Sequence, residues 1–256
     1  MRLDVCAWCA TWPFHGVPHS DVDGLLHLMD RAAIDGALVA PLDAVFDRDC
    51  RGPNARLARA LATRGDRMAF CAMANPRYPG WQETVRIADE DWGAVAVRVI
   101  PTYHGYRTDD QSLVELAEVL AERQLPLIVT TRLLDERSHP PAFRVPPAAM
   151  EGVNALRARV PRVTLVVSWA RVAEIAALDD NVAVDLSGVQ GPGGFLESLL
   201  EPPGQRRVLL GTGAVLQVPE CGLAKLGYHS LSRRQASDVA WGWARELFPR
   251  WGPSAG

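Results

Sequence analysis

The feature that most constrains the fold of this chain is the alternation of short, apolar, β-branched runs with longer amphipathic stretches. The runs expected to form strands are residues 3–6, 37–40, 68–72, 94–99, 127–130, 164–167, 182–185 and 207–210. The stretches expected to form helices are residues 22–34, 54–64, 81–91, 111–123, 148–160, 171–178, 195–200 and 233–248. Several strands are apolar throughout, which is typical of a parallel sheet covered on both faces. Eight such repeats predict an α/β fold, a single (β/α)8 TIM barrel.

An open, doubly wound sheet is the rival architecture. It would show fewer strands and a glycine-rich first turn, whereas the first strand here runs into CAWCATWPF. The length of 256 residues suits one barrel, and no internal linker or low-complexity stretch interrupts it. We therefore predict one domain over residues 1–256. The proline-rich segment 132–147 is the longest irregular connection, and we interpret it as a lid or interface loop.

Composition excludes several classes of protein. The chain is 48% hydrophobic and 22% charged, as globular proteins are, and its net charge of −3 gives no footprint for nucleic acid or an anionic membrane. The first residues are too briefly apolar for a signal peptide, and no window is long enough to span a membrane. These observations predict a cytoplasmic protein whose five cysteines are reduced thiols.

Four strings in order along the chain carry a family resemblance. They are DVCAWCATWPF, AVRVIPTYHGYRTDD, VAVDLSGVQGPGG followed by RVLLGTGAVLQVPE, and AWGWARELF. Together they resemble the first strand, the fourth strand, the last two strands and the terminal helix of amidohydrolase-related proteins. This resemblance implies a metal-dependent-hydrolase-like barrel. Its strand ends would bind one or two divalent metals and activate water for hydrolysis or decarboxylation.

The same resemblance places the metal ligands on residues that do not suit them. The expected histidine, histidine, histidine, histidine and aspartate fall on Cys6, Trp8, Thr130, Ser168 and Gly213. Only a cysteine among these can bind zinc, and a catalytic zinc site takes about three protein ligands. We therefore expect no metal in the inherited site and no cofactor.

The remaining candidate chemistry lies at the carboxyl ends of the predicted strands, where barrels of this type carry their active sites. The candidate catalytic residues are His104, Asp185 and Cys6. The candidate substrate-binding residues are Arg98, Trp8, Tyr103, Thr130, Ser168 and Thr212.

Each candidate has alternatives. Cys6 packs in the core, lines the site as a nucleophilic thiol, or joins Cys9 and a histidine such as His15 in a redox or zinc site. Arg98 is an anion clamp if it points inward and a solvated side chain if it points outward.

The acid–base candidates are equally open. His104 acts as a general base or only shapes the pocket. Asp185 accepts a proton, orients a histidine, or pairs with an arginine such as Arg171. A triad of Ser168, His104 and Asp185 can be written, without a nucleophile elbow to support it.

The other histidines have weaker claims. His15 and His19 border the mouth or lie on the surface, and His27 and His229 are interpreted as structural. His139 is expected to be exposed unless its loop folds over the barrel.

Two functions remain. The first is a metal-independent hydrolase or lyase that acts on a small, carboxylated metabolite at the mouth of the barrel. The second is a non-catalytic barrel that binds a ligand or a protein partner, and homo-oligomer formation is left open. An enzyme should place His104, Asp185 and an arginine around one cavity, whereas a degenerate barrel should fill that space with Trp8 and Trp169.

Overall fold

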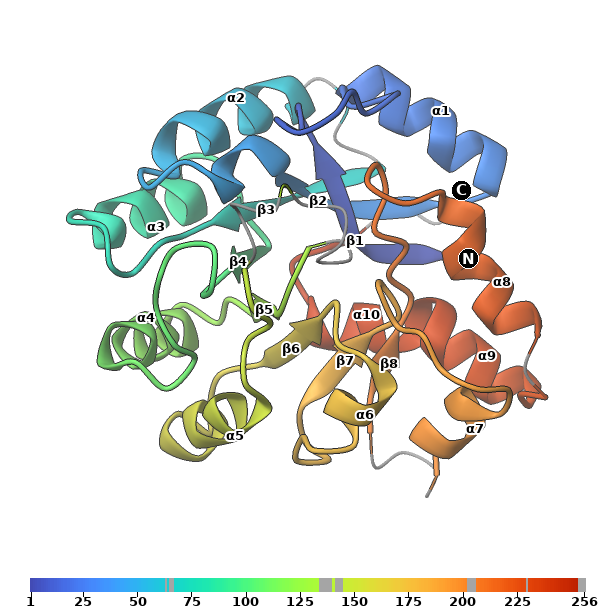
Figure 1. Ribbon diagram of the computed structural model, residues 1–256. Coiled ribbons are helices and arrows are strands. Elements are labelled where there is room, and N and C mark those ends of the chain that lie inside the picture. Colours follow the sequence, from blue (N-terminus) through green and yellow to red (C-terminus); the bar gives the residue numbers. More distant parts are fainter. Residues whose placement is uncertain are drawn as a thin grey trace.

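The computed structural model describes residues 1–62, 64, 67–133, 140, 145–201, 206–228 and 230–252. Its eight strands are β1 Leu3–Cys9, β2 Gly36–Pro41, β3 Met68–Met73, β4 Ala96–Val99, β5 Leu127–Thr130, β6 Leu165–Ser168, β7 Ala183–Asp185 and β8 Val208–Leu209. All pair in parallel and in chain order. The Val5 amide donates to the Leu210 carbonyl at 2.9 Å, and the Gly213 amide donates to the Cys6 carbonyl at 2.8 Å. These two bonds close β8 onto β1, and the predicted TIM barrel is confirmed (Figure 1).

Helices surround the strands (Figure 1). They are α1 Val22–Ala32, α2 Arg51–Leu61, α3 Trp81–Glu90, α4 Gln111–Glu122, α5 Met150–Arg159, α6 Val172–Ile175, α7 Phe195–Leu199, α8 Pro219–Gly227, α9 Arg233–Ser237 and α10 Trp243–Leu247. A 3-10 turn, η1 Leu42–Val45, follows β2, and a π-helical turn, η3 Asp238–Gly242, joins α9 to α10. Among the described residues, no helix has the length and apolar content needed to cross a bilayer.

Local chemistry explains where several helices begin. The Asp21 carboxylate accepts from the Gly24 amide at 2.7 Å and caps α1. Ser232 caps α9 through the Gln235 amide at 3.2 Å. Helix α8 was missed by the sequence analysis, although Pro219 at its first position is a helix-start signal.

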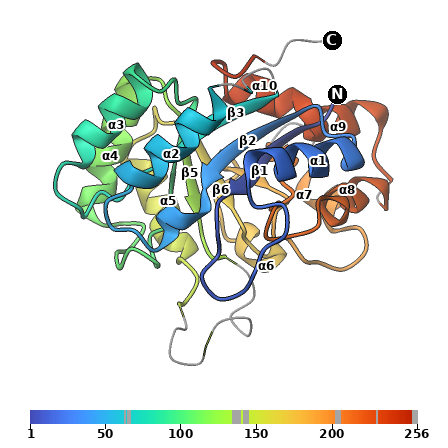
Figure 2. The same ribbon diagram turned by 90° about the horizontal axis from the view of Figure 1, so that it is seen from above.

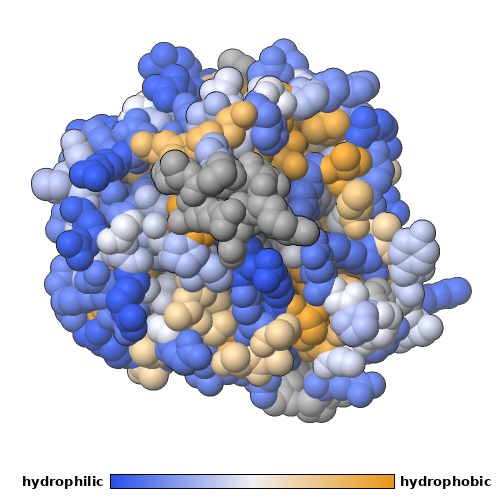
Figure 3. Space-filling model, viewed as in Figure 1, coloured by the Kyte–Doolittle hydropathy of each residue, from blue (hydrophilic) through white to orange (hydrophobic). Residues whose placement is uncertain are grey.

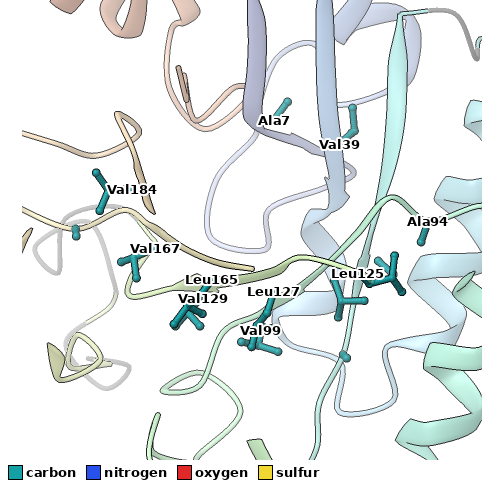
Figure 4. Close-up of a cluster of buried hydrophobic side chains, with 14 of the residues drawn as sticks. Ala7, Val39, Ala94, Val99, Leu125, Leu127, Val129, Leu165, Val167 and Val184 are labelled. Atoms are coloured by element: carbon teal, nitrogen blue, oxygen red, sulfur yellow. The ribbon is translucent and has the colours of Figure 1, made fainter. Parts of the chain in front are cut away.

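Two hydrophobic layers follow from the alternation of side chains along the strands. The outer layer lies between strands and helices and includes Val39, Val99, Val129 and Val167 (Figure 4). The inner layer fills the barrel with side chains such as Leu38, Ile128 and Leu209. The interior is a packed core, as is general for barrels of this size.

The amino end of the barrel is closed by the last helix. Ala244, Phe248 and Trp251 belong to the inner cluster, and Arg250 fastens this segment to the Asp89 carboxylate at 2.5 Å. The N-terminus and α10 lie at this end, and the segment between β1 and α1 projects from the opposite, carboxyl end (Figure 2). His139, His229 and most of the segment 132–147 lie outside the described residues.

Candidate active site

Arg98, on β4, lies inside the barrel at the carboxyl ends of the strands and is completely buried. Its Nη1 donates to Thr130 Oγ1 at 2.8 Å and to Ser168 Oγ at 3.1 Å, and its Nη2 donates to the Val5 carbonyl at 3.0 Å. Strand register explains this contact, because Thr130 pairs with Ser168 across β5 and β6 and both face inward. The inward alternative for Arg98 is the one observed.

The Arg98 guanidinium touches four of the five positions to which the resemblance assigns metal ligands. Beyond Thr130 and Ser168, Nη1 lies 3.6 Å from Cys6 Sγ, and the guanidinium carbon lies 4.8 Å from the centre of the Trp8 ring. A thiol, two hydroxyls and an indole around a fixed cation do not fit a divalent metal, which needs anionic or imidazole ligands. The described residues contain no group of three or more His, Cys, Asp or Glu side chains placed to hold a metal ion.

A chain of polar atoms leads from Cys6 to Asp185. Cys6 Sγ lies 3.4 Å from Ser168 Oγ, which lies 3.2 Å from Ser187 Oγ. Asp185 Oδ1 accepts from the Ser187 hydroxyl and from the Ser187 amide at 2.8 Å. Asp185 is thus hydrogen-bonded to Ser187 and does not form the predicted pair with Arg171.

Burial governs the protonation of both ends of this chain. It raises the pKa of Asp185 and of the Cys6 thiol, and the positive charge of Arg98 opposes both shifts without cancelling them. The resting site therefore holds Cys6 as a neutral thiol.

Asp4 completes the buried cluster and was missed by the sequence analysis. Its Oδ1 accepts from the amides of Cys6 and Thr212, both at 2.9 Å, and its Oδ2 accepts from the Thr212 hydroxyl. Burial raises the pKa of Asp4 to about 6, against the opposing effect of these hydrogen bonds. The available signal was a carboxylate two residues before Cys6 in the first strand, although a register irregularity between Asp4 and Ala7 breaks the simple alternation there.

Two tryptophans cover the cluster. Trp8 is fully buried and Trp169 is 2% exposed, so the axis of the mouth is filled. Four buried atoms in this region have no hydrogen-bond partner: Trp8 Nε1, Trp169 Nε1, Arg98 Nε and Asp185 Oδ2. Buried polar atoms without a hydrogen-bond partner are rare in native proteins, and a bound water, ion or ligand is a common explanation for them.

His104 and Tyr103 lie on the rim of the mouth. His104 Nε2 lies 3.2 Å from the Ala44 carbonyl and its Nδ1 has no partner, while burial lowers its pKa. His104 therefore bonds neither Ser168 nor Asp185, and the triad does not form. The Tyr103 hydroxyl donates to the Leu133 carbonyl at 3.1 Å, and its ring stacks against Phe46 at 5.8 Å.

Aromatic rings continue along this rim. Phe46 packs against Trp12 at 5.2 Å and against Phe14 at 5.4 Å. The carboxyl-end face is otherwise mainly hydrophilic, with smaller hydrophobic groups between the polar side chains (Figure 3). These rings therefore pack against one another in tilted or edge-to-face geometry.

The C-x-x-C pair does not converge on one site. Cys6 belongs to the inner core, whereas Cys9 belongs to the outer layer, where its thiol donates to the Ser20 carbonyl at 3.2 Å. Burial raises the pKa of Cys9 to about 11. All five cysteines are free. His15 and His19 are exposed, and the His19 ring stacks on His27 at 5.2 Å.

Comparison with known proteins agrees with this architecture. The profile of the family described as Amidohydrolase matches residues 13–250. No curated protein matches the chain.

Solved structures match over nearly the whole chain at low identity. A 2,6-dihydroxybenzoate decarboxylase from Rhizobium has a TM-score of 0.77 at 16% identity, covering 97% of this chain and 98% of its own. A manganese-bound 5-carboxyvanillate decarboxylase from Novosphingobium aromaticivorans has a TM-score of 0.78 at 14% identity, covering 97% of each chain. A 4-oxalomesaconate hydratase from Rhodopseudomonas palustris has a TM-score of 0.69 at 12% identity, covering 98% and 96%. At these identities the likeness establishes the fold alone.

Proposed function

The chain belongs to the amidohydrolase family, and from that premise we propose that it is a metal-independent member. It acts on a small carboxylated molecule at the carboxyl-end mouth of its barrel. The observation that carries this proposal is the contact of one buried guanidinium with four of the five expected metal-ligand positions. Arg98 supplies a permanent positive charge there, because an arginine side chain stays protonated at any physiological pH.

A fixed cation can perform part of what a metal performs. A guanidinium binds a carboxylate through two parallel N–H donors and stabilises an oxyanion that develops during acyl transfer or elimination. Asp185 takes up a proton through Ser187 and Ser168, and Cys6 lies at the other end of the same chain. This set suits hydrolysis of an ester or lactone, or a lyase-type elimination.

The substrate class is proposed from the charge of Arg98. A guanidinium pairs with a carboxylate, and we propose that this carboxylate is attached to a flat ring. The decarboxylases with the same fold are named for aromatic acids, which agrees with this choice. Contact between the substrate and His104 or Tyr103 stays a prediction.

A second function is favoured by a specific observation. Trp8 and Trp169 are buried over the cluster, and Arg98 Nη1 and Nη2 are engaged by groups of the chain itself. A barrel filled in this way suits a non-catalytic protein that binds a ligand or partner elsewhere on its surface.

Metal analysis and ligand binding test the proposal. Protein produced in medium supplemented with manganese and zinc should carry well under one metal per chain after dialysis. Benzoate and 2,6-dihydroxybenzoate should raise the melting temperature, whereas uncharged resorcinol should not. Arg98→Met and the milder Ser168→Ala should abolish the shift, with exposed Arg171→Met as the matched control.

The outcomes separate the two functions. One metal per chain that survives dialysis would contradict metal independence. A melting shift that depends on Arg98 with no turnover of any tested acid would favour the binding protein. No shift with any carboxylate, in a folded protein, would remove the mouth as a ligand site.

A further inference from the structure

Trp169 follows directly after β6 and is held in an unusual way. Its backbone has φ of +63°, in the left-handed region that bulky residues rarely occupy. Gly188 and Gly213, at the exits of β7 and β8, are also left-handed, at +67° and +73°. Residues with a strained backbone conformation are found most often at functional sites, where the surrounding structure holds them in that conformation.

The Trp169 ring lies between these two glycines. A Cβ atom on Gly188 would come within 2.7 Å of ring atom Cε3, and one on Gly213 within 2.9 Å of Cζ2. Real side chains do not approach so closely, so both positions must be glycine for the ring to lie there. The indole is held by packing alone, because its buried Nε1 has no hydrogen-bond partner.

An open cavity is lined by Gln217 and by residues that follow Gly213 in the chain. It has a volume of about 410 Å³ and is bounded by the β1–α1 and β8–α8 segments, with His15, His19, Arg31 and Gln217 among its lining residues. A Cβ on Gly213 would lie 3.2 Å from Gln217 Oε1, so the Gln217 side chain and the Trp169 ring lie next to each other on the same side of this glycine. The side chain of Gln217, which lines the cavity, thus adjoins the ring.

Trp169 belongs to the same inner cluster as Cys6 and Trp8. Ser168 precedes Trp169 in the chain, and Gly213 donates its amide to the Cys6 carbonyl. We propose that Trp169 is a gate, and that small anions reach Arg98 and Cys6 from the cavity beside Gly213 when the indole moves aside. The histidine and amide side chains of the cavity provide hydrogen-bond donors along this route, whereas Arg31 is paired with Glu220 at 2.6 Å. The apolar wall of the cavity accommodates a hydrocarbon ring.

The biological role of this gate rests on the proposed function, but its test requires neither turnover nor a ligand. Iodoacetamide alkylation of each cysteine is followed by mass spectrometry in native protein. In Trp169→Ala, and to a smaller extent in Trp169→Leu, Cys6 should react about tenfold faster than in the unchanged protein, because the layer above it is removed. Cys9 lies on the other side of the same strand and Cys50 is also buried, so their rates should stay unchanged.

The access route is tested in the Trp169→Ala background. His19→Trp, which partly fills the cavity, should slow Cys6 alkylation, whereas Arg107→Trp on the exposed β4–α4 segment should not. The gate is overturned if Cys6 keeps its original rate in both folded Trp169 variants, or if Cys9 and Cys50 accelerate equally. The route is overturned if Arg107→Trp slows the reaction and His19→Trp does not. Failure of the proposed function would leave all these rates unaffected.

Discussion

The guanidinium of Arg98 lies over the face of Trp8, with its central carbon 4.8 Å from the ring centre. Both side chains are fully buried, so the attraction between cation and ring acts without competition from water. Buried Asp185 supplies opposing charge nearby, as its effect on the pKa of Arg98 shows. The centre of this barrel is therefore organised around a cation that the chain itself provides.

Removing that cation should be costly. Arg98→Met keeps an unbranched apolar stem but lacks the guanidinium, and it leaves Thr130, Ser168 and the Val5 carbonyl without their donor. We expect a loss of about 3–5 kcal/mol in the free energy of unfolding, the range for breaking a buried charged network. Urea denaturation measures it, with Arg171→Met as the exposed control. A loss below about 1 kcal/mol, the usual range for a surface substitution, would mean that the cluster does not depend on Arg98.

Asp4 should make stability depend on pH in an unusual direction. Its pKa is raised from 3.8 to about 6 in the folded protein, so the folded state holds its proton more tightly than the unfolded state. The resulting stabilisation is complete below about pH 4 and is lost as the pH rises through about 6. Asp4→Asn stays neutral and should remove this contribution.

The measurement is the difference in unfolding free energy between Asp4→Asn and the unchanged protein from pH 4 to 7. Carboxylates that do not interact with Asp4 contribute equally to both proteins and cancel. Asp185, whose charge also raises the pKa of Asp4, changes the difference in the same direction. We expect the variant to gain relative stability as pH rises across this window. A constant difference would contradict the raised pKa.

Much of the fold followed from the sequence because strand and helix periodicities differ. Strand β5 was predicted to its residue bounds, and β4 and β8 proved shorter than expected. The predicted final helix is divided by the π-helical turn η3, which a hydrophobic pattern does not reveal. No element was predicted for residues 219–227, although Pro219 is a helix-start signal for α8.

The candidate site was harder to predict, because side-chain partners come from distant strands. The inward positions of Thr130, Ser168 and Asp185 follow from alternation along their strands. The inward position of Cys6 depends instead on the register irregularity between Asp4 and Ala7 in β1. That Arg98 fills the expected metal position depends on its reach across the barrel, which no local pattern encodes. The burial of Trp169 against Gly188 and Gly213 likewise requires the exits of three strands to meet.

Thiol reactivity should report the burial of the cluster. Cys221 is exposed, whereas Cys6, Cys9, Cys50 and Cys71 are buried with raised pKa values. Reaction with Ellman's reagent should show about one rapid thiol per native chain, because thiolates react and buried thiols are protonated. Cys221→Ser should abolish the rapid phase, and full denaturation should expose the rest. Rapid reaction at Cys6 in the native, unchanged protein would show that the mouth is open at rest.

Two glycines allow the backbone penalty of a left-handed φ to be separated from the collision with the Trp169 ring. Gly188 and Gly194 both have left-handed φ values, +67° and +82°, but a Cβ atom on Gly194 would meet open space. Gly194→Ala should therefore cost about 1–2 kcal/mol, the backbone penalty alone. Gly188→Ala should cost more, since the new methyl group collides with the Trp169 ring, and overpacking of this kind adds roughly 1–3 kcal/mol.

A double-mutant cycle identifies the ring as the cause of the excess. In a Trp169→Leu background the cost of Gly188→Ala should fall towards that of Gly194→Ala, because the atoms it struck are gone. Residues in contact show such non-additivity, whereas the cost of Gly194→Ala should be the same in both backgrounds. The measurement is the free energy of unfolding of all six proteins in urea. Equal costs for Gly188→Ala with and without the indole would place the Trp169 ring away from Gly188 and remove the packing on which the gate depends.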